Sequence, residues 1–215
     1  MESRQLGISG AWEFAPQVHT GSAGTFVEPY SAPEFAEAVG HPISLGHLNV
    51  SVATAGTLRG IHFGDVPPGQ AKYITCVAGA VWDVVVDLRV GSPTFGKWEG
   101  VLLDDQSRRA VYLGEGLGHG YVSLEDRSVL VYACSQPYVA GREHRINSLD
   151  PAMSIDWPTT GRDGAKLDFI IGRQDRAAPT LKQALDRGML PDLRAVNAWV
   201  ASMREKSGKN PGSPP

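Results

Sequence analysis

Short stretches of alternating apolar and polar residues recur along most of the chain. In Ala80–Leu88, one face carries only large apolar side chains, whereas the other mixes valine with Asp83 and Asp87. A period of two is typical of a strand whose two faces meet different surroundings. The same pattern predicts strands at Ala11–Val18, Thr25–Tyr30, His47–Val52, Leu58–Phe63, Lys72–Val77, Ala80–Leu88, Trp98–Leu103, Ala110–Leu113, Gly120–Leu124 and Val129–Cys134.

Turn residues separate these strands about every 8–12 residues, as in Gly91-Ser92-Pro93 and Glu125-Asp126-Arg127. Many short strands at this spacing predict an all-β sandwich or barrel. Helical patterns are few and short. A capping-box pattern at Ser31–Glu34 predicts a helix over Pro33–Val39, which Gly40 ends.

The pattern changes after Pro137. Tyr138–Pro158 has the composition of a loop, whereas Thr180–Leu190 and Ala195–Arg204 carry apolar residues at helical spacing. We expect these two helices to pack against the β body or against a partner subunit. Residues 1–206 are predicted to form one domain, and residues 207–215, rich in Ser, Gly and Pro, a disordered tail.

Composition narrows the class of protein. A length of 215 residues suits one domain, and 42% hydrophobic with 20% charged residues is ordinary for a globular protein. The net charge of −3 and the lack of a Lys/Arg cluster argue against a nucleic-acid partner. Cys76 and Cys134 lie within predicted strands, which favours free buried thiols. No apolar leader or spanning run is present, so we expect a cytoplasmic protein without a membrane segment.

Polar residues interrupt the apolar pattern of two predicted strands. His47, Asn49 and Ser51 share one face of their strand, which is unusual unless that face lines a wet cavity. In Leu58–Phe63, alternation places His62 on one face and Arg59 on the other. The turn Val66–Gly69 then reverses the chain and returns Lys72 close to His62. The pair indicates an anionic ligand between them, or else a satisfied core histidine beside a surface lysine.

Several familiar chemistries do not fit these residues. A metal-binding β-barrel needs a His-x-His pair, an acid and a later histidine, but Gly64 stands two residues after His62 and only His119 follows in the barrel. Asp83 and Asp87 lie on one strand rather than on opposed walls, so structural ion pairing explains them better than catalysis. What remains is a cavity whose predicted lining is Arg59, His62, Lys72, His119 and Tyr132, with Asn49 and Ser51 at its edge.

Motifs spread through the chain now carry a specific resemblance. They are Leu58–His62, Pro67–Lys72, Asp83–Gly96, Gly116–Gly120 and Asp150-Pro151. From about residue 10 to residue 190 the sequence resembles the dTDP-4-dehydrorhamnose 3,5-epimerase family, and especially its antibiotic-sugar branch in actinomycetes, which includes enzymes acting at one carbon only. The resemblance implies a cupin-like jelly roll without metal or other cofactor, a homodimer, and a dTDP-4-keto-6-deoxyhexose substrate.

The resemblance also assigns catalytic roles. Epimerisation beside a ketone needs a base, an acid on the opposite face and a cation at the enolate oxygen. His62 is expected to be the base, backed by Asp175 or, failing that, Asp168. Tyr132 is expected to be the acid, although a barrel-wall aromatic is the alternative. Lys72 is expected to hold the oxyanion, helped by His119 and oriented by Asp83.

The nucleotide end matches the family less closely. The binding positions that carry over are Phe26 and Glu28 at the thymine, Tyr138 stacked on the base, and Asn49, Arg59 and Glu143. Three positions depart: Ala23 replaces a phosphate-binding arginine, His47 replaces a glutamine, and Gln174 replaces the lysine before Asp175. The loss of two cations is expected to weaken diphosphate binding, unless His47 or a residue of a partner chain supplies the charge. Two rival functions stay open: a metal-dependent cupin isomerase or dioxygenase, and a non-catalytic sugar-nucleotide-binding homologue.

Overall fold

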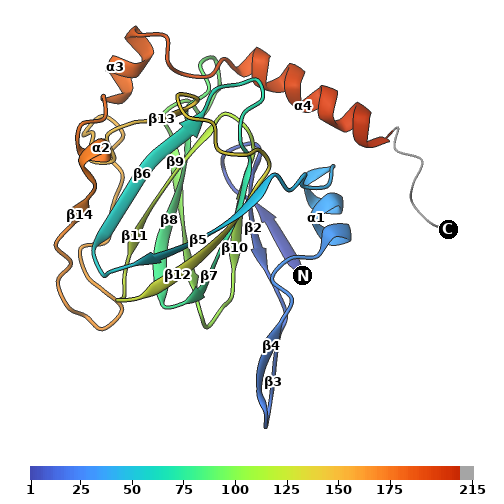
Figure 1. The fold of residues 1–215 in the computed structure, drawn as a ribbon, viewed down its shortest axis with the longest axis vertical. Helices are drawn as coiled ribbons and strands as arrows, with labels where there is room; N and C mark the ends of the chain where they lie inside the picture. The colour runs from blue at the N-terminus through green and yellow to red at the C-terminus, as the bar shows by residue number, and fades with distance from the viewer. Residues whose placement is uncertain (209–215) are drawn as a thin grey trace.

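The computed structural model of the protein describes residues 1–208. Most of its strands form two six-stranded sheets. Figure 1 shows that the two sheets pack face to face. The first sheet runs in the order β1 (Glu2–Gln5), β2 (Ala11–Ala15), β10 (Ala110–Leu113), β7 (Lys72–Ala78), β12 (Ser128–Cys134) and β5 (His47–Ala53). The second runs in the order β13 (Glu143–Arg145), β6 (Thr57–Gly64), β11 (Leu117–Ser123), β8 (Ala80–Asp87) and β9 (Trp98–Asp104), with β14 (Ile170–Ile171) beside β6. All pairings except that of β14 are antiparallel.

Three apolar clusters hold the two sheets and their covers. The interior cluster contains Ile74 of β7 and Val85 of β8, so it lies between the sheets. The outer face of the second sheet is covered by the segment after β13 and by α3 (Leu181–Asp186), through Trp157 and Leu181. On the first sheet, the ring of Phe35 from α1 (Ala32–Val39) stacks on Phe14 at 5.6 Å. This architecture confirms the predicted jelly roll with C-terminal helices.

The element boundaries differ from the prediction where prolines and short strands occur. β2 ends at Ala15 because Pro16 follows, and the chain then forms a separate hairpin, β3 (Val18–Gly21) with β4 (Gly24–Val27). Four short elements were not predicted, because strands or helices of two to four residues leave too little periodicity: β1, β13, β14 and α2 (Arg173–Arg176). α4 (Leu193–Gly208) extends two residues into the predicted tail, whose remainder lies outside the described residues.

A bulge in β6 corrects the predicted faces of that strand. His119 of β11 pairs with His62, but Tyr121, two residues on, pairs with Arg59, three residues back. β6 therefore contains one extra residue at Gly60–Ile61, where Gly60 has φ +119°. Because of it, Arg59 and His62 line the same cavity instead of opposite faces, while Leu58 and Ile61 pack in the outer cluster.

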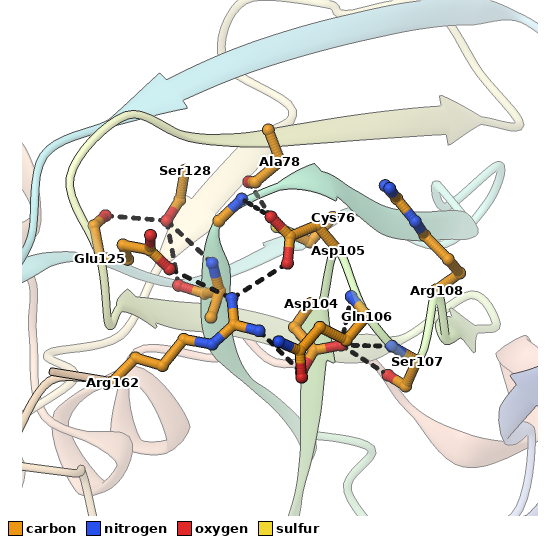
Figure 2. Close-up of polar contacts among 12 residues, drawn as sticks. Cys76, Ala78, Asp104, Asp105, Gln106, Ser107, Arg108, Glu125, Ser128 and Arg162 are labelled. Atoms are coloured by element: carbon orange, nitrogen blue, oxygen red, sulfur yellow. Dashed lines mark hydrogen bonds and ion pairs between the residues drawn. The ribbon is translucent and has the colours of Figure 1, made fainter. Parts of the chain in front are cut away.

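Three turns between strands are tied together at one end of the barrel by Arg162 (Figure 2). Its guanidinium donates to Asp105 at 3.0 Å, in the turn after β9, and to Glu125 at 3.1 Å, in the turn after β11. Asp105 in turn accepts from the backbone N–H of Gly79, between β7 and β8. The long segment that covers the second sheet is thus fastened to the barrel beyond its apolar contacts.

Cys76 and Cys134 are free and buried, as predicted. None of the described helices has the length and apolar character needed to cross a bilayer.

Candidate active site

A cavity of about 740 Å³ opens between the two sheets. Its size is in the range of small-molecule sites. Both sheets contribute to it: β5, β7 and β12 from the first, β6, β11 and β13 from the second. The lining includes His47, Asn49, Ser51, Arg59, His62, Gln70, Lys72, His119, Tyr121, Tyr132, Tyr138 and Glu143. Most residues predicted for the site therefore meet in one place.

His62 and Asp175 form a hydrogen-bonded pair at one wall. The Nε2 of His62 lies 2.8 Å from the Oδ1 of Asp175, whose side chain is 9% exposed. Asp175 comes from α2, and its second oxygen accepts from the backbone N–H of Gly60 at the bulge. Asp168, the alternative partner, instead pairs with Lys166 and is 89% exposed. Asp175 is therefore the carboxylate that contacts the imidazole.

The surroundings of this pair favour a neutral imidazole beside an ionised carboxylate. Burial lowers the pKa of His62, and the positive charge of Lys72 adds to this, which outweighs the opposing effect of Asp175. Burial alone would raise the pKa of Asp175, but the hydrogen bond from His62 and the charge of Arg145 leave it below its ordinary value. With Nε2–H donated to Asp175, the Nδ1 of the neutral ring keeps a lone pair that can accept a proton.

Tyr132 lies on the opposite sheet from His62. It stands on β12, and its ring meets His119 edge-on with centroids 6.0 Å apart. Burial, followed by the negative charge and hydrogen bonding around it, raises the pKa of the Tyr132 phenol, so the group stays protonated. Tyr121 is a neighbour that sequence reasoning missed: its hydroxyl lies 3.3 Å from Ser51 Oγ, which also accepts from Arg59 at 3.2 Å.

Lys72 opens β7 and lines the same cavity. Asp83, which was expected to orient Lys72, instead lies 2.7 Å from the Nε2 of His119, and both side chains are buried. His119 is thereby fixed beside Tyr132. Asp87, the other carboxylate of β8, is bound by Arg89, Ser92 and Thr94. The structural ion pairing predicted for Asp87 is confirmed.

The residues expected at the nucleotide fall into two groups. His47, Asn49, Tyr138 and Glu143 line the cavity, and Asn49 Nδ2 lies 2.8 Å from the Nε2 of His47. Phe26 and Glu28 do not line it. Phe26 is 68% exposed on the β3–β4 hairpin, which extends away from the sheets in Figure 1, and Glu28 follows directly after β4.

Comparisons with known proteins decide the family. A sequence profile described as dTDP-4-dehydrorhamnose 3,5-epimerase matches residues 5–183. The chain belongs to this family. It is 52% identical over 213 residues to a dTDP-4-dehydrorhamnose 3-epimerase of Streptomyces niveus, covering 99% of this chain and 100% of that protein. The predicted family is confirmed, and so is the predicted kind of enzyme, an epimerase and therefore an isomerase. The alternative of a metal-dependent cupin enzyme is set aside.

Solved structures agree with this family and with its cupin-type jelly roll. The epimerase of Mycobacterium tuberculosis superposes with a TM-score of 0.89 at 45% identity, covering 94% of this chain and 100% of that one. ChmJ, a 3'-monoepimerase from Streptomyces bikiniensis solved in complex with dTDP-quinovose, gives 0.87 at 43% identity, covering 94% and 98%. Epimerases with different carbon specificities are thus similarly close to this chain.

Proposed function

We propose that this member of the dTDP-4-dehydrorhamnose 3,5-epimerase family binds a dTDP-4-keto-6-deoxyhexose and inverts C3, C5 or both, in the biosynthesis of a deoxysugar for a natural product. The observation that carries the proposal is the hydrogen-bonded His62–Asp175 pair on one sheet wall of a cavity whose other wall carries Tyr132. Two proton-transfer groups on opposed walls are what inversion beside a ketone requires. The dTDP-quinovose complex of ChmJ supports a dTDP-sugar ligand.

Each step of the inversion then has a residue. The Nδ1 of His62 removes the proton from the carbon beside the C4 ketone, and Asp175 stabilises the resulting imidazolium. The ammonium of Lys72 balances the negative charge on the enolate oxygen. The hydroxyl of Tyr132 then delivers a proton to the opposite face of that carbon. The lowered pKa of His62 and the raised pKa of Tyr132 leave the imidazole neutral and the phenol protonated at neutral pH, which are the starting states that these two tasks need.

The nucleotide end is proposed to be completed by a second copy of the chain. Phe26 lies on the hairpin and Glu28 directly after it, both outside the cavity of their own chain, although the family resemblance places both at the nucleotide. β5, the edge strand of the first sheet, exposes Leu48, Val50 and Val52 by 60%, 65% and 58%. An exposed apolar edge strand beside a cavity favours a homodimer, in which the hairpin of one protomer reaches the cavity of the other.

Exchange of substrate hydrogens with solvent tests the proposed reaction. The protein is incubated with dTDP-4-keto-6-deoxyglucose in D₂O, and deuterium at C3 and C5 is followed by NMR. Deuterium at either carbon supports the epimerase and assigns its specificity. Stoichiometric binding without exchange would overturn it and leave the non-catalytic sugar-nucleotide-binding homologue.

A further inference from the structure

A second side chain contacts the carboxylate of the His62–Asp175 pair. The Nε of Arg145 lies 3.1 Å from the Oδ1 of Asp175, the same oxygen that His62 contacts. Among residues 1–208, this buried Nε has no hydrogen-bond partner, so its contact with Asp175 is an ion pair without a hydrogen bond. The carboxylate therefore lies between an imidazole and a guanidinium, and its two oxygens are shared by His62, Arg145 and the Gly60 N–H.

The backbone fixes Arg145 in this position. Arg145 is the residue of β13 that pairs with His62 of β6, so the two side chains are direct cross-strand neighbours. Directly beyond it, Ile146 and Ile61 exchange two backbone hydrogen bonds, of 2.8 and 2.9 Å, at the bulge. Before it, His144 Nε2 lies 2.6 Å from Asp65 Oδ1. Contacts on both sides thus anchor the three-residue strand that carries Arg145.

Four charged or titratable groups surround His62, each from a different element. Asp175 of α2 favours its protonated form, whereas Lys72 of β7 and His119 of β11 oppose protonation. Arg145 of β13 contacts the Asp175 carboxylate, so it acts on the imidazole through that charge. Without Arg145, the full charge of Asp175 would act on the imidazole. A protonated imidazole has no lone pair at Nδ1 and cannot act as a base.

From this geometry we infer that Arg145 is a positioning residue of the epimerase: it holds the Asp175 carboxylate against His62 and balances its charge, so that the imidazole stays neutral and ready to take a proton. The inference rests on the proposed function, because it assigns His62 as the base.

The test compares Arg145→Gln with Arg145→Lys across pH. Losing the cation lets Asp175 raise the pKa of His62, so the acid limb of kcat/KM in Arg145→Gln is expected to move to higher pH by about half a unit to one unit. Activity then falls several-fold near pH 6 and recovers towards the plateau at higher pH. Arg145→Lys keeps the charge and is expected to keep the limb in place. An unmoved limb in Arg145→Gln would overturn the inference.

A second measurement and a matched control separate charge from folding. NMR titration of His62 reports its protonation directly and needs no turnover, so it remains decisive even if the wild type proves not to exchange substrate hydrogens. Arg176→Gln removes an exposed guanidinium from α2, the short helix that also carries Asp175. Among residues 1–208, this guanidinium makes one hydrogen bond, to the Ile171 carbonyl. This control is expected to leave both the limb and the His62 titration unchanged. An equal shift in both variants would point to general surface charge instead.

Discussion

At the residue scale, the acid and the base stand on different strands and can be removed separately. Tyr132→Phe keeps the ring that packs beside His119 but removes the hydroxyl. Proton removal by His62 does not need that hydroxyl. We therefore expect exchange of substrate hydrogens with solvent deuterium to persist, while epimerised product falls about 10²–10⁴-fold. His62→Ala is the matched comparison, because it should remove both signals. Equal loss of exchange and product in Tyr132→Phe would contradict the two-wall assignment.

The burial of His62 makes a prediction about pH. Because burial lowers its pKa below the ordinary value of 6.5, the neutral base form predominates at neutral pH. As pH falls through this lowered pKa, the imidazole becomes protonated and activity is lost. We therefore expect kcat/KM to be flat around pH 7 and to fall only below pH 6.5. A profile that already declines between pH 8 and pH 7 would show that a different group acts as the base.

His47 offers a test of the expectation that it compensates for the arginine that the family resemblance places at Ala23. Its Nε2 is engaged by Asn49, while its buried Nδ1 has no hydrogen-bond partner among the described residues. A phosphate oxygen would supply one. His47→Ala is expected to raise KM about 5–10-fold, the loss of one hydrogen bond, with a smaller change in kcat. His47→Gln introduces the residue that the family resemblance places at this position and should bind nearly as well as the wild type, as isothermal titration with dTDP can show.

At the scale of elements, the bulge in β6 brings Arg59 and His62 to one cavity, and Gly60 is what permits it. A Cβ at Gly60 would stand 2.5 Å from the Cα of Gly120, and φ is +119°. Gly60→Ala is therefore expected to cost at least about 1–3 kcal/mol in the free energy of unfolding and to reduce activity, because the dyad and Arg59 lose their shared face. Thermal denaturation measures the first effect. Gly64→Ala on the same strand, with only ordinary contacts around a Cβ, is the control.

The bulge also marks the limit of what the sequence can predict. Strict alternation identifies nearly every long strand, and it correctly assigns Val84 and Asp83 to opposite faces of β8, because the two faces of the sheet meet different surroundings. It fails at Gly60, since one extra residue reverses the parity of a strand and only the pairing partner reveals it. β13 and α2 are too short for any period, so the sequence pattern did not indicate Arg145. The resemblance ranked Asp175 before Asp168, but only the contact with His62 decides between them.

At the scale of the whole molecule, the exposed edge of the first sheet predicts the oligomer. Leu48 and Val50 are exposed on β5, and we expect a second copy of the chain to cover this apolar surface. We expect the wild type to elute with the mass of a dimer in light-scattering chromatography. The double variant Leu48→Asp/Val50→Asp should be monomeric, because charges on both copies of the strand would be buried against each other. A wild type that is monomeric at micromolar concentration would contradict the homodimer.

The position of the hairpin leads to a complementation experiment between protomers. If Phe26 serves the partner's cavity, a His62→Ala protomer can lend its hairpin to a Phe26→Ala protomer, whose own His62 is intact. Each mixed dimer then holds one complete site, and random reassociation should restore about a quarter of the wild-type sites from two weakly active parents. Mixing His62→Ala with Tyr132→Phe is the matched control: both defects lie in the cavity of their own chain, so every site stays incomplete. Recovery in both mixtures, or in neither, would show that the hairpin does not act across the dimer.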